Sequence, residues 1–358
     1  MNAEHPAILT WRQFDPRDGD HGGTARTDQI MALAAAAGYV LRPIERGGEG
    51  RLTDRLRGAL LKLQHAGRWQ GFRPGLLGYY HRLISRSLAA HTGPRVLLCE
   101  DTLAPVPLWL ARDHGFKVIA LPHNVESLTG LSTRWSAVPR EAAALRQADA
   151  LFCIAAEDAW FWSNLGLAAA WLPYVPEGAR RARLERIATA RRHSPPDARA
   201  PWLLLGTAHN PPTREGMSQV LQWLARAGAL DQVIVAGHGT ETLREHAPPE
   251  ARILGSVTAE DLDALRRSSR GVLVHQERGS GFLTRIPEAL CAGLPVLAHR
   301  HAARSAQGLA GVSIYESPAE LRNELQQVPP SVSQAPQGRS AEFIATLRHF
   351  ATAAGAGS

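Results

Sequence analysis

The chain has 358 residues, of which 44% are hydrophobic and 20% charged, and its formal net charge is +7. This length suits two domains of about 100–200 residues each, and the apolar fraction excludes a chain that is disordered throughout. The three cysteines, Cys99, Cys153 and Cys291, are odd in number and far apart, which argues against a disulfide framework and a zinc site. No apolar run approaches the ~20 residues of a membrane-spanning helix, and residues 1–10 lack the basic start of a signal peptide, so we expect a cytoplasmic protein.

Apolar runs alternate with helical patterns along most of the chain. In chain order, the expected strands cover 7–10, 39–44, 95–100, 117–122, 150–154, 170–174, 202–206, 232–236, 252–254, 271–275, 295–298 and 312–315. Helical spacing of apolar residues separates them, most clearly at 24–37, 139–148, 213–227, 259–267 and 283–292. The strands are apolar throughout, which predicts parallel sheets covered on both faces. We therefore expect an α/β fold with two Rossmann-like, doubly wound domains facing across a cleft.

The alternation breaks once, in a polar, arginine-rich stretch that ends at Pro195-Pro196. We expect a first domain over 1–175, an interdomain linker over 176–200 and a second domain over 201–335. The remaining segment, 336–358, contains one more helical pattern at 340–352. Ligands of such folds bind beyond the carboxyl ends of the strands, so residues that follow strands are the candidates for function.

Paired glycines precede the first long helix. Gly22 and Gly23 allow close backbone approach to an anion or a sugar, while an ordinary loop capped by Thr24 would show the same pattern.

Polar residues follow two strands of the first domain. After the strand at 117–122 come His123, Asn124 and Glu126, and His123 has the chemistry to bind a sugar hydroxyl or transfer a proton. The alternative is a capping loop, with Asn124 closing a helix terminus. Glu100 and Asp101 follow the strand at 95–100 and are weaker candidates.

The second domain begins with a strand, then Gly206, then Pro211-Pro212 at a helix start, with Arg214 placed to reach a phosphate. A structural turn explains the prolines equally well.

A glycine loop after the strand at 271–275 is the strongest candidate site. Its members in chain order are Glu277, Gly279, Ser280, Gly281, Phe282, Leu283, Thr284, Arg285 and Glu288. The glycines permit close approach to a diphosphate, Arg285 is placed to clamp phosphate oxygens, and Glu288 to accept two ribose hydroxyls. An exposed Arg/Glu pair spaced i, i+3 is the structural alternative.

With these segments in hand, the chain resembles the GT-B glycosyltransferases, in particular the retaining class called glycosyltransferase family 4 or group 1. The matching runs are His21 to Thr24, Pro122 to Glu126, Cys153 to Asp158, Leu205-Gly206 with Pro211-Pro212, Val235 to Gly237, Ile253 to Val257, and Gly279 to Val296. The resemblance covers nearly the whole chain, and its last run is the most specific.

The resemblance implies a metal-independent, retaining transfer of a sugar from a nucleotide-diphosphate-sugar donor, with no cofactor. It places the acceptor, a sugar or lipid-linked molecule or a cell-surface polysaccharide precursor, on the first domain and the donor on the second. By position, Gly22 and Gly23 would face the diphosphate, His123 the transferred sugar and Gly255 to Val257 the base. Arg285 would hold the phosphates and Glu288 the ribose, and the closing helix would cross back to the first domain. The alternatives are a catalytically silent GT-B subunit acting as a scaffold and a GT-B nucleotide-sugar epimerase.

Two positions depart from the family pattern. The family often has a glutamate eight residues before the position of Glu288, where this chain has Ser280, and Glu277 lies three residues earlier. The usual phosphate lysine is Arg285, and the only candidate for its basic companion is Arg214.

The charge is concentrated in one segment. Residues 51–90 carry eight basic residues against Asp54 alone, an excess equal to the net charge of the whole chain. A solvated helical face is the common reason for such a run. Because aromatic residues such as Trp69 and Tyr79 are interleaved with it, we also expect a peripheral contact with an anionic membrane. No recognised module suggests nucleic-acid binding.

Overall fold

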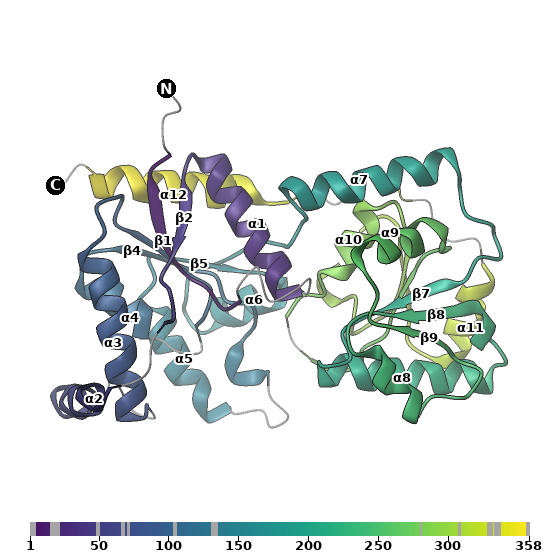
Figure 1. Ribbon diagram of the computed structural model, residues 1–358, viewed down its shortest axis with the longest axis horizontal. Helices are drawn as coiled ribbons and strands as arrows, with labels where there is room; N and C mark the ends of the chain where they lie inside the picture. Colours follow the sequence, from purple (N-terminus) through teal and green to yellow (C-terminus); the bar gives the residue numbers. More distant parts are fainter. Residues whose placement is uncertain are drawn as a thin grey trace. The chain divides into compact units, whose positions relative to one another are not determined.

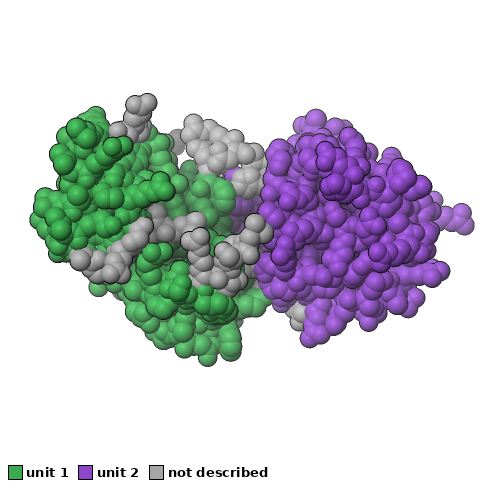
Figure 2. Space-filling model, turned by 90° about the horizontal axis from the view of Figure 1, so that it is seen from below, with its two compact units in different colours: residues 1–19, 30–173, 339–358 green, residues 20–29, 174–338 purple. Residues whose placement is uncertain are grey.

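The computed structural model describes residues 5–14, 22–47, 51–65, 69, 72–102, 106–129, 135–279, 281–306, 309–327, 332 and 338–355 (Figure 1). The chain divides into two compact units, coloured separately in Figure 2. Unit 1 comprises residues 1–19, 30–173 and 339–358, and unit 2 comprises 20–29 and 174–338. Each unit contains one six-stranded sheet.

The sheet of unit 1 is parallel in all its pairings and has the order β2-β1-β3-β4-β5-β6. Its strands are β1 (Ala7–Trp11), β2 (Val40–Pro43), β3 (Val96–Cys99), β4 (Lys117–Ala120), β5 (Ala150–Cys153) and β6 (Ala169–Trp171). The order steps outward in both directions from β1 and β3, as in a doubly wound sheet.

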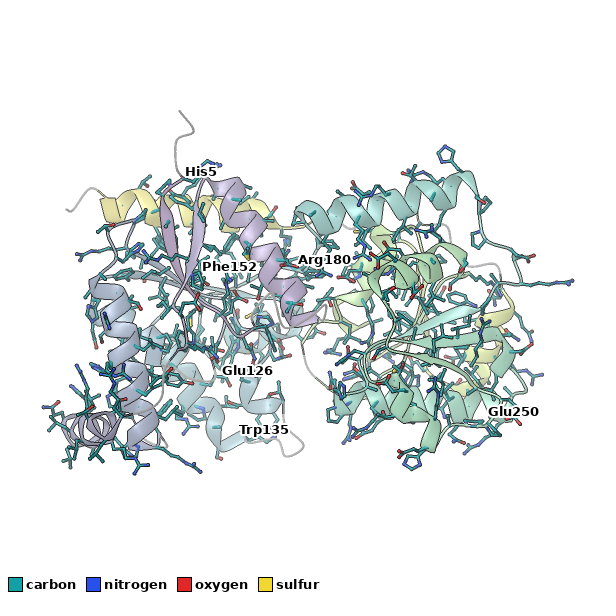
Figure 3. All side chains as sticks on the ribbon, in the orientation of Figure 1. His5, Glu126, Trp135, Phe152, Arg180 and Glu250 are labelled. Atoms are coloured by element: carbon teal, nitrogen blue, oxygen red, sulfur yellow. The ribbon has the colours of Figure 1, made fainter. Side chains whose placement is uncertain are left out.

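Helices cover both faces of this sheet. They are α1 (Gly22–Ala37), α2 (Leu52–Gln64), α3 (Pro74–Ala89), α4 (Val106–Asp113), α5 (Val138–Leu145), α6 (Ala156–Asn164) and α12 (Ser340–Gly355). Alternate residues of each strand face opposite layers: Leu98 of β3 packs with α1 and α12, whereas Leu97 packs with α3, α4 and α6. Phe152 of β5 meets Phe343 of α12 edge to face at 5.4 Å, which fixes the C-terminal helix on unit 1 (Figure 3).

The sheet of unit 2 is also parallel, with the order β12-β11-β10-β7-β8-β9. Its strands are β7 (Trp202–Leu205), β8 (Val233–Ala236), β9 (Arg252–Gly255), β10 (Val272–Val274), β11 (Val296–His299) and β12 (Val312–Tyr315). Its helices are α7 (Gly178–His193), α8 (Pro211–Arg226), α9 (Ala259–Ser268), α10 (Arg285–Cys291) and α11 (Pro318–Gln326). Apolar residues of α8 and α11 pack on one face and those of α7 and α10 on the other.

The segment expected to link the domains contains a helix. The segment 176–200 was expected to be a linker, but most of it forms α7, and residues 20–29 at the start of α1 cluster with unit 2. Leu184, Ile187, Ala188 and Arg191 recur at helical spacing and are buried, although arginines dominate the rest of the segment. A narrow apolar stripe is enough to bury a helix on one side.

Within the described residues, the structure contains no helix that is long and apolar enough to cross a membrane.

Candidate functional site

In unit 1, the carboxyl ends of β3 and β4 bring Glu100 and His123 together. Cys99 and Ala120, which end these strands, are partners in the ladder, so the residues that follow them share one edge of the sheet. His123 Nε2 lies 3.3 Å from Glu100 Oε2, and both side chains are buried. The carboxylate orients the imidazole through Nε2.

Asp101, at the same edge of the sheet, forms an ion pair with an arginine in the loop that follows β2. Arg46 Nη2 lies 2.7 Å from Asp101 Oδ2, and the Arg46 guanidinium lies over the Trp11 ring, 4.3 Å from its centroid. Sequence reasoning missed Arg46, because no local pattern distinguishes it from the many other arginines of the chain.

Glu126 and Glu141 form a carboxylate pair after β4 (Glu126 is labelled in Figure 3). Glu141 accepts hydrogen bonds from the backbone N–H groups of Glu126 and Ser127, at 2.9 and 2.7 Å, and from the Ser127 hydroxyl. Burial, and after it the neighbouring Glu141 carboxylate, raise the pKa of Glu126 to about 7 against the opposing effect of a hydrogen bond from Asn124. Glu126 is therefore a carboxyl group poised to exchange a proton near neutral pH.

In unit 2, the glycine loop follows β10, and side chains from beyond β11 contact its backbone carbonyl groups. Gly279 and Gly281 have φ angles of 117° and 72°, in the left-handed region that favours glycine. His301 Nε2 lies 3.0 Å from the Gly279 carbonyl oxygen, and Arg304 donates to the Gly281 carbonyl. Ser280 lies outside the described residues. Phe282 and Leu283 line a small hollow with Arg304.

The start of α1 lies against this loop within unit 2. A Cβ atom on Gly22 would come 3.0 Å from Thr284 Oγ1, so the Gly22 backbone already approaches the residue before α10 closely. Gly23 follows in the first turn of α1. The structure thus brings the N-terminal glycines to the glycine loop, although the two lie more than 250 residues apart in sequence.

Arg285 is the first residue of α10 and carries a half-buried side chain. Burial, and after it the positive charge of Arg304, lower its pKa to about 10. Its Nε is buried, and no described residue accepts a hydrogen bond from that atom. Two guanidinium groups beside an open glycine loop form an electropositive site that suits phosphate oxygens.

The remaining donor-side residues are placed as follows. Glu277 accepts a hydrogen bond from Gln219 Nε2 at 2.8 Å. Gly206 has no room for a side chain, since a Cβ atom would lie 2.7 Å from Thr213 Cγ2. Arg214 is exposed in the first turn of α8. Gly255 has φ 89° and ends β9, ahead of Ser256 and Val257.

Glu288 is the centre of a buried ion-pair network. Its carboxylate accepts hydrogen bonds from Tyr174 Oη at 2.9 Å, Arg180 Nη1 at 3.1 Å and Arg266 Nη2 at 3.2 Å. A carboxylate has about four acceptor positions, so one remains for a ligand. The sequence analysis missed Arg180 of α7 and Arg266 of α9. The residues next to each arginine in the sequence give no sign that it pairs with Glu288 in another helix. Among the described residues, no group of three or more histidine, cysteine or acidic side chains could hold a metal ion.

No protein-family model and no curated protein sequence matches the chain. Solved structures do. Sucrose-phosphate synthase from Thermosynechococcus elongatus aligns with a TM-score of 0.64 and 13% identity over 98% of both chains. HepE from Anabaena in complex with UDP-glucose aligns with a TM-score of 0.62 and 14% identity over 98% of this chain and 99% of that one. An α,α-trehalose-phosphate synthase (UDP-forming) from Burkholderia xenovorans aligns with a TM-score of 0.60 and 14% identity over 96% of both.

These likenesses extend over nearly the full length of each protein, and they agree with the two parallel, doubly wound sheets described above. Together they confirm the expected architecture: the chain has the GT-B fold.

Proposed function

We propose that the chain is a glycosyltransferase that moves a sugar from a nucleotide-diphosphate-sugar donor to an acceptor by a metal-independent, retaining mechanism. The fold supports this proposal, because the solved structures it matches include a UDP-forming trehalose-phosphate synthase and HepE bound to UDP-glucose. In the proposal, unit 2 holds the donor and unit 1 holds the acceptor.

Arg285 is the observation that carries the proposal. Its buried Nε has no acceptor among the described residues, and its cation lies beside a second arginine and two glycines with left-handed backbone. A buried N–H donor without an acceptor is costly, and an anionic ligand at this position would accept its hydrogen bond. The donor diphosphate is that ligand in our proposal.

The reaction breaks the bond between the anomeric carbon and the diphosphate oxygen, and it forms a bond from that carbon to an acceptor oxygen on the same face of the sugar. The leaving diphosphate takes the electron pair, and Arg285 with Arg304 stabilises the charge that develops. The acceptor hydroxyl passes its proton to an oxygen of the leaving diphosphate in the same step. His123, oriented by Glu100, is assigned to a hydroxyl of the transferred sugar, and Glu126 with Asn124 to the acceptor.

Gly22 and Gly23 are assigned to the diphosphate, because Gly22 lies against Thr284. Gly255 to Val257 are assigned to the base and Glu288 to the ribose through its remaining acceptor position. We further propose that the acceptor is lipid-linked or a polysaccharide precursor and that the enzyme works at the inner, anionic face of a membrane through residues 51–90.

A panel of UDP-, GDP- and dTDP-sugars tests the proposal through the thermal stabilisation of the protein. We expect one donor to raise the unfolding temperature of the wild type and, at the same concentration, to raise that of Arg285→Ala much less. Stabilisation by none of them would contradict a donor site and favour a silent scaffold subunit. Conversion of a stabilising donor without any acceptor would contradict transfer and favour an epimerase.

A further inference from the structure

The helix α2 carries a row of leucines on the side turned away from the rest of unit 1. Leu52, Leu56, Leu60 and Leu63 are 73%, 68%, 53% and 82% exposed, and we call them the leucine row. At about 100° per residue they fall within about 80° of the helix circumference. Scattered exposed leucines are ordinary on protein surfaces, but four on one stripe of a single helix form a continuous apolar surface.

The opposite side of α2 packs on α3. The leucine row is therefore not the side by which α2 joins the core of unit 1. A Cβ atom on Gly58 would lie 1.8 Å from the Pro74 carbonyl oxygen, and one on Gly78 would lie 1.8 Å from the Asp54 carbonyl oxygen. The two backbones therefore touch at these glycines. Figure 1 shows α2 beside α3 at the end of unit 1.

An ion pair between the two helices sets their rotation. Asp54 is 1% exposed and accepts two hydrogen bonds from Arg82 of α3, at 2.8 Å and 3.0 Å. Since Asp54 and Gly58 face α3, the residues half a turn away face solvent. The leucine row is thus held outward by a defined contact.

Basic residues border the leucine row. Arg51, Arg55 and Arg57 are exposed, and Lys62 is partly exposed. The one acidic residue of α2 is Asp54, which is buried and neutralised by Arg82. The outer surface of α2 therefore combines leucines with cations and carries no exposed acidic residue.

The aromatic residues of the basic segment do not share this surface. Trp69 is 1% exposed, Phe72 and Tyr80 pack against the core of unit 1, and the partly exposed Tyr79 ring lies under the Arg82 guanidinium. Trp69, Phe72 and Tyr80 therefore do not provide the apolar part of the membrane contact in our proposal, because they cover the core of unit 1. The exposed apolar residues are the leucines.

Charge decides which partner fits. A second copy of the chain packed on the leucine row would bring two sets of arginines together, and like charges at short distance oppose association. An anionic bilayer offers phosphates for the cations and acyl chains for the leucines, which is the combination that an interfacial helix needs.

We propose that α2 is a membrane-docking helix that lays the leucine row into the boundary of an anionic lipid bilayer while Arg51, Arg55 and Arg57 bind lipid phosphates. This inference deepens, and rests on, the proposal that the enzyme acts at a membrane surface. In this inference α2 is the binding element, the leucine row enters the bilayer, the lipids are anionic, and α3 holds α2 in position.

Flotation of the full-length protein with vesicles tests the proposal. Vesicles of phosphatidylcholine with phosphatidylglycerol should bind the wild type, vesicles of phosphatidylcholine alone should bind it much less, and added salt should release it. The double variant Leu56→Ser/Leu63→Ser should lose about tenfold or more in vesicle affinity. The matched control is Leu165→Ser, which removes a leucine that is 39% exposed at the end of α6 and should bind like the wild type.

Three results would overturn the proposal: no binding by the wild type at low salt, equal binding by the leucine variant, or a solution dimer that the leucine variant dissociates. The unfolding temperature of each variant shows whether the fold is intact. Donor-induced stabilisation, measured on the same samples, separates the two proposals. Vesicle binding without stabilisation by any donor contradicts the transferase, and stabilisation without vesicle binding contradicts the docking helix.

Discussion

Arg180 at the start of α7 donates a hydrogen bond to the carboxylate of Glu288 in α10 over 3.1 Å (Arg180 is labelled in Figure 3). The same arginine binds Asp28 of α1 at 3.0 Å, and Arg266 of α9 reaches the second oxygen of Glu288. The residue that the family resemblance places on a ribose is therefore also the junction of α7, α9 and α10. Its loss should affect folding as well as binding.

Glu288→Ala should lower the free energy of unfolding by about 3 kcal/mol, because it removes the carboxylate that Arg180 and Arg266 share and leaves these cations only their pairings with Asp28 and Asp263. Denaturant unfolding measures the effect. The control is Glu185→Ala, which removes an ion pair with Arg181 whose carboxylate is 53% exposed and should cost no more than about 0.5 kcal/mol. Similar losses in the two variants would contradict the buried network.

Arg285→Ala should weaken donor binding by about 10- to 100-fold, the value of a charge-assisted hydrogen bond to phosphate. It should leave the free energy of unfolding nearly unchanged, because nothing described accepts a hydrogen bond from its Nε. Calorimetric titration with the stabilising nucleotide sugar, combined with thermal unfolding, measures both quantities.

Arg191 provides the contrast for this experiment. Burial lowers its pKa to about 10, as it does for Arg285, but Arg191 donates to the carbonyl groups of Arg266 and Ser269 at 2.7 Å each. A single hydrogen bond contributes about 1 kcal/mol, so Arg191→Ala should lower the free energy of unfolding by several times that amount. A stability loss in Arg285→Ala as large as in Arg191→Ala would contradict a ligand-binding role for Arg285.

The α2–α3 pair should lose stability in acid. Arg82 lowers the pKa of Asp54 from 3.8 to about 2, so the folded state binds this proton more weakly than the unfolded state. The contribution is complete above pH 3.8 and disappears as the pH falls toward 2. Asp54→Asn should remove this part of the acid transition and should lower stability at pH 7 by about 1.5–3 kcal/mol. Unfolding curves of both proteins between pH 2 and 7 measure the difference, and parallel curves would contradict the pairing.

Glu126 should give the opposite dependence. Its pKa rises from 4.5 to about 7, so the folded state holds the proton more tightly than the unfolded state, and stability falls as the pH rises from 4.5 through 7. Glu126→Gln mimics the protonated carboxyl group and should flatten this slope, with a gain in stability at pH 8. An unchanged slope would show that another group causes the dependence.

His123→Ala should lower turnover by about 100-fold or more while donor affinity stays close to that of the wild type, since His123 is assigned to the reacting sugar and not to the diphosphate. Glu100→Gln should lower turnover as well, because it changes the group that orients the imidazole through Nε2. Equal losses in donor affinity and in turnover would contradict these assignments.

The sequence determined the fold, and the reason is local. All twelve expected strands are present among the described residues, because a buried parallel strand needs a short run of Val, Ile and Leu that any reader of the chain can see. The same applies to the glycine loop after β10, where left-handed backbone at Gly279 and Gly281 requires the residue type that the sequence shows. Charge along the chain likewise identified residues 51–90 as unusual.

Only the tertiary structure decided what the charged and apolar side chains of these segments touch. Glu288 pairs with Arg180, which lies in a segment expected from the sequence to be a linker. Gly22 lies against Thr284, although the two residues are separated by most of the sequence. Trp69 is buried, and the leucine row faces outward because Gly58 and Gly78 let the opposite side of α2 lie directly on α3. Contacts of this kind depend on which elements pack together, and local sequence periods do not encode them.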